Sequence, residues 1–503
     1  MGFDALLDGF QLISLNTMVW CLVGVFVGML AGTLPGIGPS SGIAILLPLT
    51  FELGALNALV MMMSIYLGAM YGGRISSILV NVPGEPSAVV ATFDGYPMTK
   101  QGKAGYVLTL SAIASFIGGV IGFVGLAFLT APIAQAALSF GPPEYFALMA
   151  FALVATSGLI EKKPFKAILS TLIGLLIATI GLDNVTGEPR LTFGLLGLWE
   201  GIDFIVVAIG IFGLSEVLAR LDNGSEMNGL DTKLSFKSLF PKASEVISDK
   251  WAMLRGSLIG FFVGVLPGAG ATVAAFLSYS AEKKLSKKPE NFGKGESKGL
   301  SAPESASTAA VGGALIPTLS LGVPGSSTTA ILLGGLMMVG LQPGPMMFQE
   351  SGDIITGALV VFFIANILLL ILNTACVPVF SYLVKKLDPY MVPVITVFCF
   401  LGVYLMNFSL FEVGVMFFFG FFGYFMNKCG IPFAPLILAV ILGPMMEKSL
   451  RQTLSSTGND YTVFFTRPIS ATLLFITIAI LILPLIRMIL SKRKSSEGKN
   501  INL

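Results

Sequence analysis

The chain has 503 residues, of which 54% are hydrophobic and 12% are charged, and its formal net charge is +2. Soluble domains carry about 25% charged residues. Histidine is absent, which excludes HExxH zinc sites and the Ser-His and Cys-His pairs of nucleophilic catalysis. Apolar runs of about 20 residues, long enough to cross a bilayer, recur along the chain. The sequence therefore predicts an all-α polytopic integral membrane protein in a lipid bilayer, with about 12 membrane segments and no nucleic-acid partner.

Pro-Gly motifs of two kinds interrupt these apolar segments, and each kind occurs twice in the same order. "GTLPGIGPSSG" (32–42) precedes "NVPGEPSAVV" (81–90), and "GVLPGAGATVA" (264–274) precedes "GVPGSSTTAI" (322–331). We call them the LPG and VPG motifs. The LPG motifs are offset by 232 residues and the VPG motifs by 241 residues. Because proline and glycine break helices, the pattern predicts a duplicated unit with broken or re-entrant helices.

The lysines and arginines predict opposite orientations for the two halves, because short cytoplasmic loops collect these residues. Lys100 and Lys103 make one first-half loop basic, whereas the equivalent second-half loop, 341–353, is acidic. Conversely, the loop after the first LPG motif carries only Glu52, whereas its counterpart is a lysine-rich insertion at about 282–302. We therefore expect inverted-topology repeats with an external N-terminus and a cytoplasmic C-terminus.

The same pattern divides the chain into four parts. We expect a first membrane repeat over 1–219, a cytoplasmic connector over 220–255, a second membrane repeat over 256–490, and a basic cytoplasmic tail over 491–503. Inverted repeats with interrupted helices are typical of secondary transporters, whose substrate site lies near the bilayer midplane where the breaks meet.

The VPG motifs are the predicted substrate site. The first turn of a helix presents unpaired N–H groups and the positive end of its dipole, and neighbouring hydroxyls complete a cradle for an anion. The alternative interpretation is that these hydroxyls only cap the restarted helices. The predicted substrate-binding residues here are Gly84, Ser87, Gly325, Ser326, Ser327 and Thr328.

The LPG motifs are the predicted ion-binding or hairpin segments. Unwound carbonyls at such breaks coordinate Na⁺ in transporters, and Na⁺ is the only metal ion that the sequence suggests. The alternative is a tight turn at which glycines let two helices pack closely. Ser40 and Thr272 occupy matching positions, and the full set is Pro35, Gly36, Gly38, Ser40, Pro267, Gly268, Gly270 and Thr272.

Ionisable residues within apolar segments are few, and each costs about 3 kcal/mol at the centre of a membrane helix. For Arg74 the alternatives are contact with a carboxylated substrate, an ion pair with Glu85, or extension to a membrane interface. Glu304 and Asp94 are candidates for sensing a coupling proton or ion, with a helix-end or loop role as the alternative.

Three long blocks carry a family resemblance: "GTLPGIGPSSGIAILLPLTF", "YGGRISSILVNVPGEPSAVVATFDGYPMTKQGKAG" and "APESASTAAVGGALIPTLSLGVPGSSTTAILLGGLMMVGLQPGP". Over about residues 10–490 the chain resembles the large membrane subunit of tripartite tricarboxylate transporters. The resemblance implies a multi-pass importer of the bacterial inner membrane, in which the external N-terminus expected from the lysine distribution is periplasmic. It also implies a small membrane subunit and a periplasmic substrate-binding protein as partners, a carboxylate substrate such as citrate, and coupling to a Na⁺ or H⁺ gradient without another cofactor.

The interrupted segments further suggest an elevator-like mechanism, in which a domain of broken helices moves against a scaffold of intact ones. An intramembrane enzyme and a passive channel are the alternatives. The sequence contains no acid-base constellation that favours an enzyme, and a channel would conduct without an ion gradient or a binding protein.

Overall fold

The computed structural model describes residues 8–34, 37–81, 83–158, 164–183, 187–223, 243–268, 270–375, 386 and 390–481. Within these ranges the chain is helical almost throughout. Its two described strands, β1 (Gly181–Leu182) and β2 (Pro189–Arg190), pair antiparallel in one short hairpin. This content agrees with the predicted all-α class.

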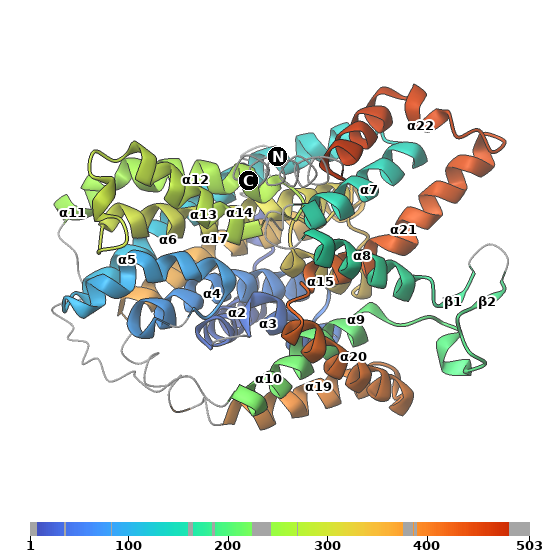
Figure 1. Cartoon of the computed structure of the whole chain (residues 1–503), viewed down its shortest axis with the longest axis horizontal. Coiled ribbons are helices and arrows are strands. Elements are labelled where there is room, and N and C mark those ends of the chain that lie inside the picture. Colours follow the sequence, from blue (N-terminus) through green and yellow to red (C-terminus); the bar gives the residue numbers. More distant parts are fainter. Residues whose placement is uncertain are drawn as a thin grey trace, which may run out of the picture. The chain divides into compact units, whose positions relative to one another are not determined.

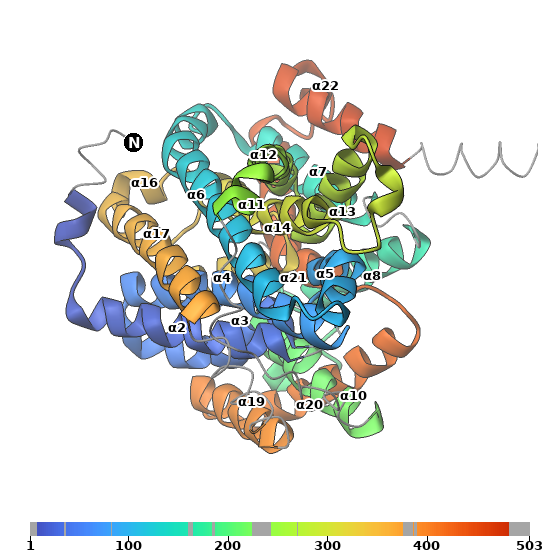
Figure 2. The same cartoon turned by 90° about the vertical axis from the view of Figure 1, so that its left-hand side faces the viewer.

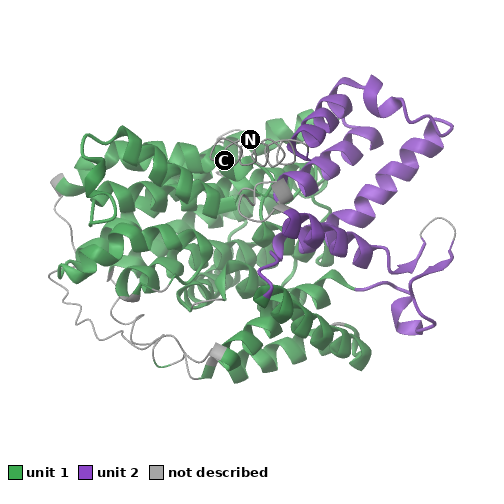
Figure 3. Cartoon of the chain, viewed as in Figure 1, with its two compact units in different colours: residues 1–138, 203–428 green, residues 139–202, 429–503 purple. Residues whose placement is uncertain are grey.

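The chain divides into two compact units, each built from two separate stretches of sequence (Figure 3). Unit 1 comprises Met1–Leu138 and Asp203–Lys428, and unit 2 comprises Ser139–Ile202 and Cys429–Leu503. Each unit thus takes residues from both halves of the chain. Each repeat predicted from the sequence instead occupies one half of the chain. The two units therefore divide the chain in another way, and the repeat boundaries stay a prediction.

Unit 1 contains all the described residues of the LPG and VPG motifs. Its elements in chain order (Figure 1) are α2 (Leu15–Thr33), α3 (Gly38–Leu46), η1 (Leu47–Leu53), α4 (Ala55–Val80), η2 (Pro86–Ala88), α5 (Val89–Lys100), α6 (Ala104–Ala137), α9 (Phe204–Ala208), the π-helix η4 (Ile209–Leu214), α10 (Ser215–Asn223), α11 (Ala243–Ser248), α12 (Lys250–Val265), α13 (Gly270–Leu285), η6 (Pro289–Asn291), α14 (Ser297–Leu321), α15 (Ser327–Met338), α16 (Met347–Glu350), α17 (Gly352–Ala375), α19 (Met391–Asn407) and α20 (Leu410–Lys428).

Six helical segments among the described residues are long and apolar enough to cross a membrane: α2, α4, α6, the continuous α9–α10 segment, α17 and α20. Shorter apolar helices occur in addition, α15 among them. Large apolar side chains on α20 are exposed, with Phe418 at 63% and Phe425 at 60%, as expected of a surface in contact with lipid. The chain is therefore a multi-pass membrane protein, and the total of about 12 segments stays a prediction.

The helix breaks of unit 1 fall at the LPG motifs. α2 ends at Thr33 and α3 begins at Gly38, and 232 residues later α12 ends at Val265 and α13 begins at Gly270. Figures 1 and 2 show α2, α3 and α4 side by side, and likewise α12, α13 and α14. The two halves thus place the same kind of break at equivalent positions.

The first residue of each VPG motif has a left-handed backbone conformation and ends the helix that precedes it. α4 is followed by Asn81, with a φ of 61°, and α14 is followed by Gly322, with a φ of 68°. This conformation ends a helix by turning the chain away from its axis. Beyond it, Pro86 opens η2 at the first helical position, where proline is favoured.

Glycines every fourth residue let the long helices of unit 1 pack backbone to backbone. A Cβ added to Gly28 of α2 would lie 2.4 Å from the carbonyl oxygen of Ile65 in α4. At the equivalent Gly260 of α12, a Cβ would lie 2.1 Å from the carbonyl oxygen of Ala306 in α14. Small residues are what membrane helices use for such close approach. The hairpin alternative proposed for the LPG motifs is therefore compatible with the packing on their N-terminal side.

Unit 2 is a smaller helical assembly in which α21 packs against α7 and α8. The contact is close, since a Cβ on Gly174 of α8 would lie 2.4 Å from the Leu436 carbonyl oxygen of α21. Its described elements are α7 (Pro142–Gly158), α8 (Pro164–Ala178), β1, β2, η3 (Leu196–Leu198), α21 (Ala434–Ser456), α22 (Val463–Thr466) and a further apolar helix over Pro468–Leu481.

Candidate functional site

The first LPG motif meets the second VPG motif in unit 1, although the two are far apart in sequence. The hydroxyl of Ser40, in the first turn of α3, lies 3.0 Å from Oγ1 of Thr328 and 3.2 Å from Oγ of Ser327. Both partners lie in the first turn of α15. The structure thus brings together one predicted ion-binding residue and two predicted substrate-binding residues.

The LPG and VPG motifs within each half also contact each other. In the second half, the Gly268 N–H donates to the Gly325 carbonyl at 2.9 Å, and a Cβ on Gly270 would lie 3.6 Å from Cβ of Ser326. In the first half, a Cβ on Gly38 would lie 3.8 Å from Cβ of Glu85.

The described motif residues therefore form one connected group, which we call the break cluster. Of the predicted residues, Pro35 and Gly36 lie outside the described residues, Pro267 is buried, and Thr272 is half-buried. The cluster comprises Gly38, Ser40, Gly84, Glu85, Ser87, Gly268, Gly270, Gly325, Ser326, Ser327 and Thr328.

At the start of α15, two hydroxyl residues cap the helix and two others do not. Ser326 is the N-cap: its hydroxyl accepts from the Thr329 N–H at 3.2 Å, and its own N–H donates to the Thr329 hydroxyl at 2.9 Å. The capping interpretation thus accounts for Ser326 and Thr329. It does not account for Ser327 and Thr328, whose hydroxyls contact Ser40 instead.

Several donors therefore converge at the start of α15. The Tyr66 hydroxyl of α4 lies 3.4 Å from the Ser326 hydroxyl, which adds a third helix to the group. The first-turn N–H groups of α15 and the positive end of its dipole add to these hydroxyls. Such an arrangement can bind an anion without a fixed positive charge.

The first VPG motif carries different chemistry from the second. The hydroxyl of Ser87 donates to the Glu85 carboxylate, and Glu85 is only 7% exposed. An offset of 241 residues makes Glu85 the equivalent of Ser326. Sequence reasoning treated Glu85 only as a partner for Arg74, although the alignment of the two VPG motifs already singled it out.

Arg74 forms a buried ion pair with Glu304 of α14. Its Nη1 lies 2.9 Å from Oε2 of Glu304, and the two side chains are 1% and 6% exposed. Of the sequence-based alternatives, the Glu85 pairing is wrong, because Glu304 is the acidic partner, and the interface alternative is wrong, because the side chain is buried. A direct substrate contact stays a prediction.

Hydroxyls of α6 complete the surroundings of this ion pair. Arg74 donates to the hydroxyls of Ser111 and Ser115 and, at 2.8 Å, to the Ser111 carbonyl. The same hydroxyls donate to Glu304 at 3.1 and 3.4 Å. The guanidinium also lies 4.3 Å from the ring centre of Tyr71. This network joins α4, α6 and α14.

Asp94 organises the lysine-rich insertion between α13 and α14. Its Oδ1 accepts from the N–H groups of Gly293, Gly295 and Glu296 at 2.8–2.9 Å. Its Oδ2 accepts from the Tyr279 hydroxyl at 3.0 Å. Of the two alternatives for Asp94, the loop role has a direct structural basis.

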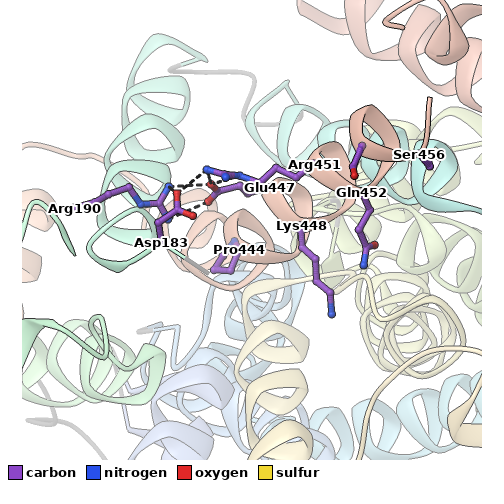
Figure 4. A pocket seen from close by; sticks show the side chains of 9 residues that line it. Asp183, Arg190, Pro444, Glu447, Lys448, Arg451, Gln452 and Ser456 are labelled. Carbon is purple, nitrogen blue, oxygen red and sulfur yellow. Dashed lines mark hydrogen bonds and ion pairs between the residues drawn. The ribbon is translucent and has the colours of Figure 1, made fainter. Parts of the chain in front are cut away.

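Unit 2 contains a separate charged pocket of about 600 Å³, which the sequence did not predict (Figure 4). Four of its residues alternate in charge: Arg190 lies 2.8 Å from Glu447 and 3.5 Å from Asp183, and Arg451 lies 2.7 Å from Asp183 and 2.8 Å from Glu447. Hydrogen bonding from Arg190 holds the pKa of Glu447 below its ordinary value. The charges of this ring compensate one another. Its ion pairs therefore mainly hold the β1–β2 hairpin against α21.

Comparison with known proteins decides which family the chain represents. The family model described as "Tripartite tricarboxylate transporter TctA family" matches residues 18–438, a range that includes all four motifs. The chain belongs to this family. The resemblance drawn from the motif blocks is thereby confirmed, and the break cluster lies within the part of the chain that is characteristic of the TctA family.

Two proteins of Agrobacterium vitis are similar to this TctA-family chain. An uncharacterized 52.8 kDa protein in the TAR-I ttuC' 3' region is 40% identical over 482 residues, which is 95% of this chain and 94% of the relative. An uncharacterized protein in the TAR-II ttuC' 3' region is 39% identical over 237 residues, or 46% of this chain and 97% of the relative. No solved structure matches the chain significantly.

Proposed function

We propose that this TctA-family chain is the large membrane subunit of a secondary active transporter that imports a small di- or tricarboxylate across the bacterial inner membrane. A Na⁺ or H⁺ gradient drives the import, a periplasmic binding protein delivers the substrate, and a small membrane subunit completes the complex. The observation that carries the proposal is the convergence of the Ser40, Ser327 and Thr328 hydroxyls at the start of α15.

The chemistry of the break cluster suits a carboxylate. A carboxylate accepts hydrogen bonds from N–H and O–H donors, and the cluster offers both at the positive end of a helix dipole. Neither α3 nor α15 contains an ionisable residue. A site made of neutral donors binds an anion without a fixed salt bridge, which leaves it free to release the substrate on the other side.

Equivalent contacts support the inverted repeats that transport requires. Gly38 approaches Glu85 as Gly270 approaches Ser326, with separations between the added Cβ and the neighbouring Cβ of 3.8 and 3.6 Å. Repeats of opposite orientation bring equivalent half-sites together at the midplane and exchange outward-facing and inward-facing states. The N-terminus is then periplasmic, and the connector and the C-terminal tail are cytoplasmic.

An elevator-like movement is the mechanism that we favour. All described residues of the breaks belong to unit 1, as a moving domain that carries the substrate requires. Na⁺ binding at the unwound LPG carbonyls belongs to the same proposal. A passive channel and an intramembrane enzyme predict instead that flux or turnover is indifferent to an imposed gradient.

Uptake into proteoliposomes that contain both membrane subunits and receive the binding protein tests the proposal. The double variant Ser327→Ala/Thr328→Ala should fold as the wild type but lose most uptake, because the two hydroxyls that face Ser40 are gone. The matched control is Thr318→Ala/Ser320→Ala, which removes two buried hydroxyls of α14 that bond only to carbonyls of their own helix. Equal uptake by the two double variants would contradict the anion site.

A further inference from the structure

The segment that follows β2, residues 191–199, exposes several large apolar side chains. We call this segment the hairpin arm. Phe193 is 82% exposed and Leu196 is 74% exposed. Leu195 and Trp199 of the same segment are exposed as well. A contiguous group of exposed apolar side chains indicates contact with another molecule or with a membrane.

Two residues of the hairpin arm have an uncommon backbone conformation. Leu191 has a φ of 53° and Phe193 has a φ of 50°, in the left-handed region that large side chains rarely adopt. Packing within the chain does not offset this cost, because both side chains are exposed. Strained residues of this kind occur preferentially at binding sites. The conformation of the arm therefore supports a contact with a molecule outside the chain.

α8 and α21 run parallel to each other toward the β1–β2 hairpin. Lys166, near the start of α8, donates to the carbonyl of Cys429, which precedes α21. At the other end, a Cβ on Gly443 of α21 would lie 2.8 Å from Cβ of Ala178, the last residue of α8. Lysines stand at the start of α8, so the lysine rule makes this end cytoplasmic. The 15 residues of α8 span about 22 Å, which is most of the hydrocarbon core. We therefore expect the hairpin arm at the periplasmic boundary of the bilayer.

The charged pocket of unit 2 adjoins the hairpin arm at Arg190. Three cations and two carboxylates line the pocket, so one positive charge is not compensated. This charge belongs to Lys448, because the two arginines form ion pairs with Asp183 and Glu447. No partner of Lys448 occurs among the described residues. The pocket thus offers one free cation beside the exposed apolar side chains.

Neighbouring hydrogen-bond donors add to this cation. Gln452 lies one helical turn beyond Lys448, and the two side chains extend from the same side of α21 (Figure 4). Ser455 lines the pocket as well. Nε of Arg190 is buried and has no acceptor in the described part of the chain, which is unfavourable. Together these groups favour a ligand with several acceptor oxygens.

We propose that the hairpin arm and the charged pocket together bind an anionic phospholipid of the periplasmic leaflet, such as phosphatidylglycerol. The apolar side chains of the arm contact the acyl chains, and Lys448 and Gln452 bind the phosphodiester. The single negative charge of this headgroup matches the free cation of the pocket. Trp199 has the amphipathic ring that prefers this depth in a membrane. The lipid site belongs to unit 2, whereas the break cluster belongs to unit 1.

The test follows the fluorescence of Trp199 in the purified 503-residue chain. Trp20→Phe and Trp251→Phe leave Trp199 as the one tryptophan of this parent variant. Phosphatidylglycerol with brominated acyl chains is titrated into the detergent micelles, and quenching of Trp199 reports its binding. Lys448→Gln removes the free cation and leaves the ion pairs of the pocket intact. Lys103→Gln, at an exposed position of unit 1, is the matched control for charge.

We expect saturable quenching in the parent variant. Lys448→Gln should need about fivefold more lipid, which is the effect of one lysine near an anionic surface, and Lys103→Gln should behave as the parent. Absence of saturable quenching, or equal effects of the two lysine variants, would overturn the proposal. Displacement of the lipid by glycerol phosphate would identify a soluble oxyanion as the ligand instead. Loss of quenching when the small membrane subunit is added would assign the arm to that subunit, which also overturns the proposal.

A second pair of variants separates lipid binding from folding. Phe193→Asn removes the most exposed ring of the arm, and asparagine favours left-handed backbone, so this variant should not melt below the parent in the absence of lipid. Phe408→Asn is the matched control, because Phe408 also has a φ of 50° and is 71% exposed. We expect Phe193→Asn, but not Phe408→Asn, to lose most of the quenching of Trp199. Undiminished quenching in Phe193→Asn, or a lower melting temperature of this variant without lipid, would contradict the lipid contact.

Discussion

Removing one partner of the Arg74–Glu304 ion pair is expected to cost about 3–5 kcal/mol of unfolding free energy, because the other charge stays buried without a partner. At the observed 2.9 Å, the attraction is about 6 kcal/mol for an effective dielectric constant of about 20. Withdrawing each ion from water costs several kcal/mol, so the intact pair contributes little net stability. A single substitution loses the attraction and retains the desolvation cost of the remaining ion.

The chain supplies its own control for this prediction. An offset of 241 residues makes Leu315 the equivalent of Arg74 and Met63 the equivalent of Glu304, and both apolar residues are fully buried. The double variant Arg74→Leu/Glu304→Met therefore places in each helix a residue that already packs at the equivalent position. We expect this double variant to be more stable than either single variant and close to the wild type.

A double-mutant cycle measures the effect. The purified subunit is unfolded with SDS in mixed micelles, and helix content is followed by circular dichroism. We expect a coupling energy of about 3 kcal/mol between the two substitutions. Two single variants that each lose less than about 1 kcal/mol, the size typical of an exposed ion pair, would refute the reasoning. So would losses that simply add in the double variant.

Three further predictions follow from contacts outside the cluster. Gly260→Ala should lower the melting temperature in detergent, because its Cβ would meet a backbone oxygen at 2.1 Å, whereas Gly414→Ala, with open space around it, should not; equal melting temperatures would contradict the packing. Asp94→Ala should speed proteolysis within 282–302, because three backbone N–H groups lose their acceptor; an unchanged cleavage rate would exclude this role. The lowered pKa of Glu447 stabilises unit 2 above the unfolded-state pKa of that residue, and this stability is lost as pH falls through its folded-state pKa. Glu447→Gln should therefore reduce the free energy of unfolding that is lost on acidification by at most about 1 kcal/mol. The same loss in the variant and the wild type would contradict this role.

The sequence predicted the breaks because their causes are local. Proline and glycine stop a helix wherever they stand, so the ends of α2 and α12 could be located from the LPG motifs alone. The matched offsets also indicated which breaks are equivalent. The contact of Ser40 with Thr328 agrees with the expectation that breaks from the two halves meet. That expectation came from the order of the motifs and from the lysine distribution, which predict a duplicated and inverted unit.

Side-chain partners could not be predicted in the same way. Arg74 pairs with Glu304 because α4 and α14 both pack against α6, and that arrangement leaves no periodic signal in the sequence. Glu85 is closer to Arg74 along the chain, which made it the natural candidate. The charged ring of unit 2 joins the β1–β2 hairpin to α21, elements about 260 residues apart, and it depends on the tertiary fold.

Comparison of the two halves separates what folding requires from what transport requires. Equivalent glycines make equivalent backbone contacts, so close packing is common to both halves. The charges differ: Glu85, Arg74 and Glu304 correspond to Ser326, Leu315 and Met63. Since serine and apolar residues fill the equivalent positions, the fold does not need the charges, and burying them costs free energy. A costly group that packing does not require is expected to serve function, and all three charged residues belong to α4, α14 or the VPG break between α4 and α5.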